Sequence, residues 1–370
     1  MISKKYRMMK RYMMMAGTVS VLLFASCAIL DDKKETGILS VVISDADGVV
    51  TRASEVKELS YEKAVNTLQI FIFEGETLFR REKVDSGIGS LPWSKSYGSL
   101  KTGSYKVYVV ANAPDLDQID TERGLNEQLI RLSDCSLDGS RGFVMAGRAT
   151  AVIGGGAMVT ASVPLTRFAA RVRLASVENQ VPATYAQGGA VTVKSVFLIN
   201  ALGTWNLAGS GSPVGWVNLG GRAAGRSASS YRGDYIASQE QVHPAAFLQQ
   251  VFRMDGSIVA NGGTKKYADC CLYSFPNLVQ TDHTGSTATE AEGAMTRLVV
   301  LATVNGADWW YPVTLFKDGS GIERNTSYDV RLTIRATGST DPNEPVGKGS
   351  LSASVSVSPW IPGAEYAETI

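Results

Sequence analysis

The residue with the clearest chemistry in this sequence is Cys27. It follows Leu23-Phe24-Ala25-Ser26, and small residues directly before a cysteine are typical of a lipoprotein signal, in which the thiol is acylated after cleavage. The upstream apolar stretch Ala16–Ala25 follows a basic segment and is shorter than the ~20 residues that span a membrane. The sequence therefore predicts a lipoprotein signal peptide over residues 1–27 with an acylated Cys27. An ordinary signal peptide with a chance cysteine is the alternative.

The other residue types offer little enzyme chemistry. His243 and His283, the two histidines of the chain, lie in polar segments without a cluster at metal-ligand spacing. The glycines Gly154–Gly156 are not followed by Lys-Ser or Lys-Thr, so they indicate a hairpin turn and not a phosphate loop. The acidic segment Asp341–Pro345 offers calcium ligands, but a solvated turn is the preferred interpretation. We therefore expect no enzyme, no cofactor and no metal site.

Charge and cysteine content fit an exported protein. The formal net charge changes from +1 to −4 when the five cations between Lys4 and Arg11 are removed with the signal peptide. Such a chain lacks the basic face that nucleic-acid binding requires. Cys135, Cys270 and Cys271 form an odd set that allows at most one disulfide, and buried free thiols are the preferred interpretation.

The chain is dominated by short apolar segments that are bounded by Gly, Asn and Pro, as in strands. One helix is predicted over Thr121–Leu132, because Leu125, Leu129 and Leu132 recur at helical spacing. The pattern predicts a mainly all-β fold of two antiparallel β-sandwich domains, transthyretin-like or Greek-key, with one or two short helices. The predicted strands are Ile38–Ser44, Leu68–Phe73, Tyr105–Asn112, Phe143–Gly147, Ala157–Val163, Phe168–Leu174, Val191–Asn200, Tyr267–Phe275, Thr296–Val304, Trp309–Phe316, Ser327–Arg335 and Ser350–Val357.

The segment between Cys27 and Ala53 has the composition of a removable piece. It holds one strand, Ile38–Ser44, then a Gly/Asp-rich loop and a lone arginine in Thr51-Arg52-Ala53. We expect a propeptide over residues 28–52, an N-terminal β-sandwich over 53–165, and a C-terminal β-sandwich over 166–370.

One stretch near the C-terminus resembles a known family. Gly321–Ile334 reads G-I-E-R-N-T-S-Y-D-V-R-L-T-I and is followed by the turn Gly338–Pro345, a β-run to Val357 and then Trp360. This order resembles the C-terminal half of FimA-type major fimbrillins of the Bacteroidales, the subunits of type V pili. Weaker matches at residues 68–73, 107–113 and 143–146 extend the resemblance over most of residues 38–370.

The resemblance implies a mode of assembly. The subunit would be exported as an outer-membrane lipoprotein, and an Arg-specific, trypsin-like protease would cut between Arg52 and Ala53. Loss of the first strand would open a sheet edge, whose unpaired N–H and C=O groups a neighbour's strand would satisfy. The donor would be C-terminal, with Trp360, Tyr366 and Ile370 as candidate groove anchors. For Ser350–Val357, closing the subunit's own sheet is an equal alternative.

The sequence thus predicts a shaft subunit of a cell-surface fimbria that supports adhesion. Its partners would be copies of itself, other fimbrial subunits, the protease and, through the lipid before cleavage, the outer membrane. An accessory tip or anchor subunit is one alternative. A glycan-binding surface lipoprotein is another, with Trp205, Trp216, Tyr231 and Tyr235 in the Gly/Ser-rich stretch 203–238 as a sugar platform.

Overall fold

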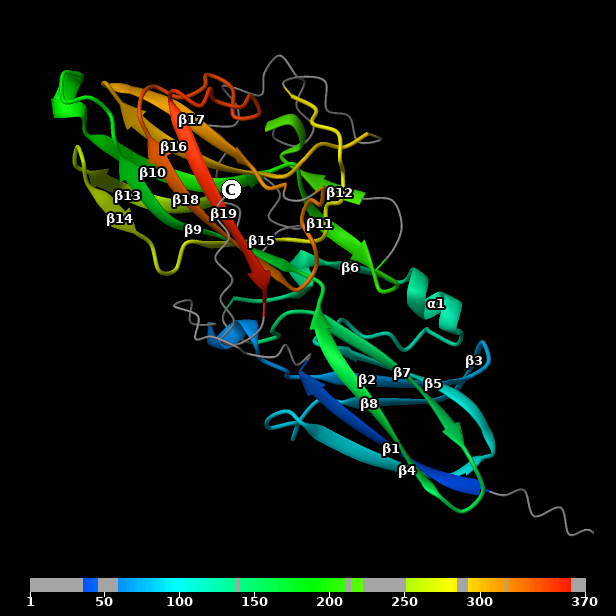
Figure 1. Cartoon of the computed structure of the whole chain (residues 1–370). Coiled ribbons are helices and arrows are strands. Elements are labelled where there is room, and N and C mark those ends of the chain that lie inside the picture. The colour runs from blue at the N-terminus through cyan, green and yellow to red at the C-terminus, as the bar shows by residue number, and fades with distance from the viewer. Residues whose placement is uncertain are drawn as a thin grey trace, which may run out of the picture. The chain divides into compact units, whose positions relative to one another are not determined.

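The computed structural model of the protein describes residues 36–45, 59–137, 140–209, 214–221, 251–284, 292–316 and 319–360 (Figure 1). Within these ranges the chain consists mainly of strands, with one short α-helix, α1 (Glu122–Glu127). The expectation of a mainly β fold is confirmed. No helix in the described ranges has the length and apolar character to cross a membrane.

The first sheet has seven strands in the order β3-β2-β5-β7-β8-β1-β4. Its core consists of alternate residues of these strands, such as Ile70 and Ile72 of β2 and Val107 and Val109 of β5. This alternation is the two-residue period of a strand, and the intervening Phe71 and Phe73 of β2 are buried in a second hydrophobic cluster. The strands are β1 (Thr36–Asp45), β2 (Leu68–Glu74), β3 (Thr77–Val84), β4 (Trp93–Lys101), β5 (Gly103–Ala111), β7 (Met145–Ile153) and β8 (Met158–Arg167).

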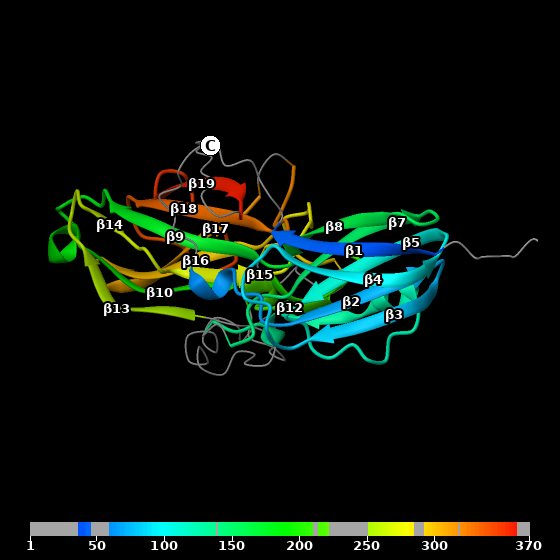
Figure 2. The same cartoon turned by 90° about the horizontal axis from the view of Figure 1, so that it is seen from below.

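The remaining strands form three further sheets. Their orders are β13-β10-β16-β17, β12-β11-β6 and β14-β9-β18-β19, and β15 also pairs with β9; Figure 2 shows β9, β18 and β19 side by side. The strands are β6 (Leu129–Arg131), β9 (Ala170–Asn179), β10 (Val191–Ile199), β11 (Ala201–Asn206), β12 (Val214–Val217), β13 (Val251–Val259), β14 (Thr264–Lys266), β15 (Cys271–Ser274), β16 (Arg297–Val304), β17 (Ala307–Thr314), β18 (Thr326–Ile334) and β19 (Leu351–Pro359).

Two strand pairs are parallel, which the expected antiparallel pattern did not include. β1 runs parallel to β8, and β9 runs parallel to β18. Parallel neighbours need a long connection, and here several other strands intervene in the sequence. Local patterns report which face of a strand is buried, but they do not report which distant strand lies beside it.

The predicted helix at Thr121–Leu132 is shorter than expected. Thr121 caps α1, because its Oγ1 accepts a hydrogen bond from the Gly124 N–H at 3.0 Å. The helix ends at Glu127, and the segment from Leu129 pairs with β11 as strand β6. Leu129 is 51% exposed, so its helical spacing from Leu125 did not reflect burial. Pairing with a distant strand overrides the local helical periodicity here.

The predicted solvated turn at Asp341–Pro345 is wrong for its first three residues. Asp341 and Asn343 are buried, and burial raises the pKa of the Asp341 carboxyl. The Asn343 Oδ1 accepts hydrogen bonds from Arg297 Nη1 at 2.7 Å and from Asn200 Nδ2 at 3.0 Å. In the described part of the chain, no group of His, Cys, Asp and Glu side chains has the arrangement of a metal site. The turn therefore forms hydrogen bonds inside the protein.

All three cysteines in the described residues are buried free thiols. Burial raises the pKa of Cys135 and of Cys271 to about 12, and it also raises the pKa of Cys270. A raised thiol pKa keeps the reactive thiolate scarce near neutral pH. The preferred sequence interpretation, free buried thiols, agrees with this arrangement.

We expect the native cysteines to react with iodoacetamide at pH 8 at least about 1000-fold more slowly than in urea, because an unfolded thiol has a pKa of ~8.5. Mass spectrometry of residues 28–370 would measure this, and rapid native labelling of Cys135 would contradict it. The pKa of each thiol is higher in the folded protein than in the unfolded chain, so folding favours the protonated thiol. The stability that the protonated thiols contribute is therefore complete below pH ~8, and the free energy of unfolding falls as the pH rises toward about 12.

Candidate assembly site

The first strand, β1, is paired along both of its edges (Figure 1). It runs parallel to β8 from the pair Ile38–Met158 to the pair Asp45–Leu165. On its other side it runs antiparallel to β4 from the pair Thr36–Lys101 to the pair Ile43–Trp93. We call β1 and the two edges that it covers the β1 site. Removal of β1 would leave unpaired backbone groups on both β8 and β4.

One face of β1 is fully apolar and fully buried. Leu39, Val41 and Ile43 are each 0% exposed and belong to the core of the first sheet. Burial of such a side chain stabilises by about 1.5–3 kcal/mol. The intervening residues, such as Val42, are more exposed. β1 therefore pairs with two neighbouring strands and also contributes side chains to the hydrophobic core.

The first inward position of β1 accepts no side chain. A Cβ on Gly37 would lie 2.7 Å from Ile153 Cγ2, 2.8 Å from the Gly154 carbonyl oxygen and 2.9 Å from the Ala157 carbonyl oxygen. These distances are shorter than ordinary van der Waals contact. A strand that fills the β1 site in this register therefore needs glycine at this position.

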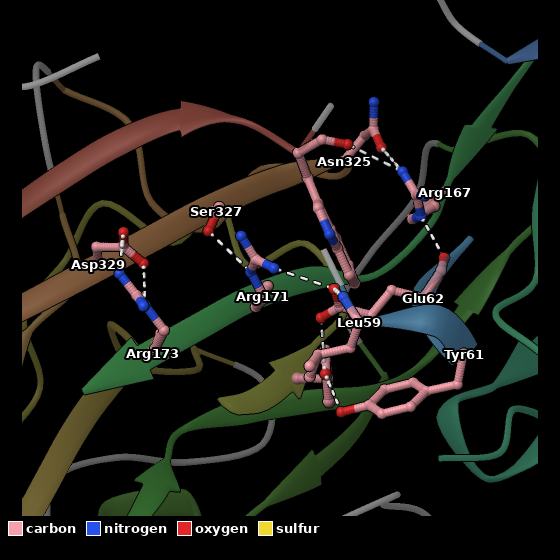
Figure 3. Close-up of polar contacts among 11 residues, drawn as sticks. Leu59, Tyr61, Glu62, Arg167, Arg171, Arg173, Asn325, Ser327 and Asp329 are labelled. Carbon is pink, nitrogen blue, oxygen red and sulfur yellow. Dashed lines mark hydrogen bonds and ion pairs between the residues drawn. The ribbon is translucent and has the colours of Figure 1, made fainter. Parts of the chain in front are cut away.

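A second feature is a buried carboxylate just after the segment 46–58. Glu62 ends the 3₁₀ helix Ser60–Glu62 and is 0% exposed. Its Oε2 accepts hydrogen bonds from the Leu59 N–H at 2.8 Å and from Arg171 Nη1 at 3.0 Å. Its Oε1 accepts one from the Tyr273 hydroxyl at 2.9 Å. Figure 3 shows Glu62 and Arg171 facing each other. Three donors thus compensate the buried charge.

Polar contacts continue from Arg171 along β9 and β18 (Figure 3). Arg171 Nε donates to Ser327 Oγ at 3.0 Å. Two residues further on, Arg173 forms a bidentate pair with Asp329, at 3.0 Å and 2.9 Å. Because alternate residues of neighbouring strands share a face, these pairs bind β9 to β18 on one side of the sheet.

Arg167, the last residue of β8, connects the Glu62 segment to the end of β19. Its Nε donates to the Glu62 carbonyl oxygen at 2.8 Å, and its Nη1 donates to the Trp360 carbonyl oxygen at 2.9 Å. The Trp360 N–H donates to the Asn325 carbonyl oxygen at 2.7 Å. Segments from three distant parts of the sequence therefore meet at one buried arginine.

The Trp360 side chain lies among aromatic rings and cations. Its ring stacks on Tyr273, with centroids 5.7 Å apart, and meets Phe143 edge to face at 5.3 Å. The guanidinium carbons of Arg167 and Arg171 lie 5.0 Å and 5.6 Å from its ring centroid. Trp360 is 1% exposed. Cation–π and stacking contacts therefore surround a fully buried indole.

The predicted site residues are distributed unevenly over the described chain. Trp360 is described, and it lies in the core of its own chain. Its role as a groove anchor in a neighbour stays a prediction. The preceding strand β19 pairs with β18 from Leu351 to Pro359, which is the own-sheet alternative for Ser350–Val357. The lipidation, cleavage and remaining donor predictions lie outside the described residues: Cys27, Arg52, Ala53, Tyr366 and Ile370.

The sequence reasoning missed Glu62, Arg167 and Arg171. Glu62 belonged to a stretch that appeared merely polar, between Ser54 and Thr67. A signal was present in Phe168–Leu174, because arginines there alternate with apolar residues of a predicted core strand. Charges at such positions are rarely buried unless they are paired.

The predicted aromatic platform is not an exposed surface at its two described members. Trp205 lies in β11 and is 6% exposed, and Trp216 in β12 is partly buried. Tyr231 and Tyr235 lie outside the described residues. Trp205 therefore acts as a core residue, and Trp216 packs against the same core.

Comparison with known proteins agrees with this architecture. Residues 39–181 match the family model of the major fimbrial subunit protein FimA. A putative cell adhesion protein from Bacteroides eggerthii is 19% identical, with a TM-score of 0.57 over 88% of this chain and 96% of that one. A fimbrilin (FimA) from Porphyromonas gingivalis is 13% identical, with a TM-score of 0.56 over 90% and 99%.

The tip fimbrial protein Mfa3 from Porphyromonas gingivalis, with a C-terminal truncation, also shares the fold. It is 14% identical, with a TM-score of 0.52 over 88% of this chain and 100% of that one. At these identities the structural matches establish the fold, and the sequence match to the FimA family model covers residues 39–181. The chain thus has the fold of the fimbrial and cell adhesion proteins that it resembles, with a FimA-like segment at residues 39–181.

Proposed function

We propose that this protein is a shaft subunit that is exported as a lipoprotein, cut after Arg52 and polymerised by donor-strand exchange. In this proposal residues 1–27 are the signal peptide, Cys27 carries lipid, and residues 28–52 are released. Residues 53–165 and 166–370 form the two β-sandwich domains, and the C-terminal tail is the donor. The outer membrane would hold the precursor through its lipid until the cut.

The observation that carries the proposal is the arrangement of β1. This strand has ten residues, pairs along both edges, and buries three apolar side chains. Arg52 lies in the segment 46–58, between β1 and the rest of the first sheet. A cut there would make β1 a separate peptide, held only by non-covalent contacts. A neighbour's strand could then replace it and restore both the edge hydrogen bonds and the core contacts.

Such a contact joins two different surfaces of identical subunits. One subunit would offer its β1 site and the other its tail, which is a heterologous contact. Heterologous contacts that do not close into a ring generate open filaments. The proposal therefore accounts for a polymer of one repeating subunit.

Limited trypsin digestion of residues 28–370 tests this proposal. We expect a new N-terminus at Ala53 by N-terminal sequencing, followed by filaments in electron micrographs. The Arg52→Ala variant should give neither product. Arg123→Ala is the matched control, because Arg123 is a highly exposed arginine at a site away from the proposed cut, and it should behave like the parent chain.

Two results would redirect the assignment. A chain that is cut cleanly at Ala53 but stays monomeric would favour a tip or anchor subunit, since the tip protein Mfa3 shares the fold. A monomer that binds a glycan array would favour the glycan-binding alternative.

A further inference from the structure

We propose that Trp360 is the fixed root of the C-terminal tail, held by its own subunit during exchange, so that only residues 361–370 enter a neighbour. This inference rests on the proposed function and narrows it. The residues that hold the root are Glu62, Arg167, Arg171 and Tyr273, and we call them, with Trp360, the Trp360 cluster. Trp360 then positions the donor segment and does not fill the neighbour's groove.

The backbone of Trp360 is bound on both sides. Its N–H donates to the Asn325 carbonyl oxygen at 2.7 Å, and its carbonyl oxygen accepts from Arg167 Nη1 at 2.9 Å. These bonds directly extend the β18–β19 ladder, whose last pair is Thr326–Pro359. Trp360 therefore continues a strand that already belongs to its own subunit.

The side chain of Trp360 is also held within its own subunit, by ring contacts. Departure of the indole would uncover the faces of Tyr273 and Phe143 and remove the ring from two buried guanidinium groups. Arg167 and Arg171 are 6% and 5% exposed, and both also bind Glu62. Exchange that moved Trp360 would break this network, whereas exchange that begins after Trp360 leaves the network intact.

The root also has a defined position relative to the β1 site of its own subunit. Arg167 ends β8, and β1 covers β8 up to the pair Asp45–Leu165. The root therefore lies close in the structure to one end of the β1 site.

A disulfide that fixes the root tests the inference. Thr326 and Pro359 are directly opposite on β18 and β19, and directly opposite positions are close enough for a disulfide. We expect the oxidised Thr326→Cys, Pro359→Cys variant of residues 28–370 to form filaments after trypsin within about twofold of the reduced variant's rate. Ser104→Cys with Val152→Cys is the matched control, since it joins β5 and β7, which exchange does not separate.

The outcomes separate the two ideas. If the reduced variant and the oxidised control assemble but the oxidised 326/359 variant does not, Trp360 leaves its subunit and the inference is overturned. If the parent chain is cut at Ala53 and never assembles, the proposed function fails first and the inference fails with it. Should Pro359→Cys prevent folding, Ser327→Cys with Ser358→Cys fixes β19 one pair earlier in the ladder, with the same expected and opposing results.

Discussion

Replacement of Glu62 by alanine is expected to lower the free energy of unfolding by about 3–5 kcal/mol, the usual cost of removing one partner of a buried ion pair. Glu62 is 0% exposed, and its loss would leave Arg171 buried without its carboxylate. The Leu59 N–H and the Tyr273 hydroxyl would lose their acceptor as well. Urea denaturation followed by tryptophan fluorescence would measure the change.

The matched control for this prediction is Glu127→Ala. Glu127 also pairs with an arginine, Arg123, but the two side chains are 64% and 81% exposed. Exposed pairs of this spacing contribute about 0.3–0.5 kcal/mol. Equal effects of the two substitutions would show that the contacts of Glu62 are not a buried ion pair of structural importance.

Replacement of Val41 by aspartate is expected to detach β1 from the sheet without any protease. Val41 is 0% exposed in the middle of β1, and a carboxylate there would be buried without a hydrogen-bonding partner. Such a group costs several kcal/mol, more than the strand gains from any one of its apolar side chains. Hydrogen exchange would detect the loss of protection in β1. Filaments of the uncut chain would follow if an open β1 site suffices for assembly.

Val42→Asp is the control, because it places the same charge one residue away on the opposite face of β1. Val42 is only partly buried, so a carboxylate there keeps access to water. We expect β1 of this variant to stay protected from exchange and assembly to stay dependent on the cut at Arg52. A Val41→Asp chain with β1 amides as protected as those of the parent would contradict the assigned role of β1 as a core strand.

The most specific string of the resemblance lies in one part of the sequence, and the family model matches another. The string Gly321–Ile334 lies outside residues 39–181, which carry the family match. The structure shows what this string does. The Tyr328 hydroxyl donates to the Gly321 carbonyl oxygen and accepts from the Glu323 N–H, both at 2.9 Å, and so closes the loop before β18. Asp329 then pairs with Arg173. The motif therefore combines a local loop closure by Tyr328 with one ion pair to a distant strand.

Strands that are largely buried were predictable from the sequence, and two exposed edge strands of the first sheet were not. β2, β10 and β18 were found within a few residues of their ends, because their apolar residues are dense and bounded by turn residues. β3 and β4 were missed. Their residues are mostly exposed or half-buried on both faces, so neither strand has the two-residue alternation that marks a buried face.

The sequence by itself determined the mainly β class, the resemblance to FimA-type proteins and the presence of a strand before Arg52, because these depend on local composition and contiguous motifs. Only the tertiary structure placed β1 between β8 and β4, which come later in the chain and lie apart from each other in the sequence. Only the tertiary structure brought Glu62, Arg167, Arg171 and Trp360 into one cluster. Buried ion pairs and strand neighbours depend on which distant segments pack together, and no local period of residues encodes that choice.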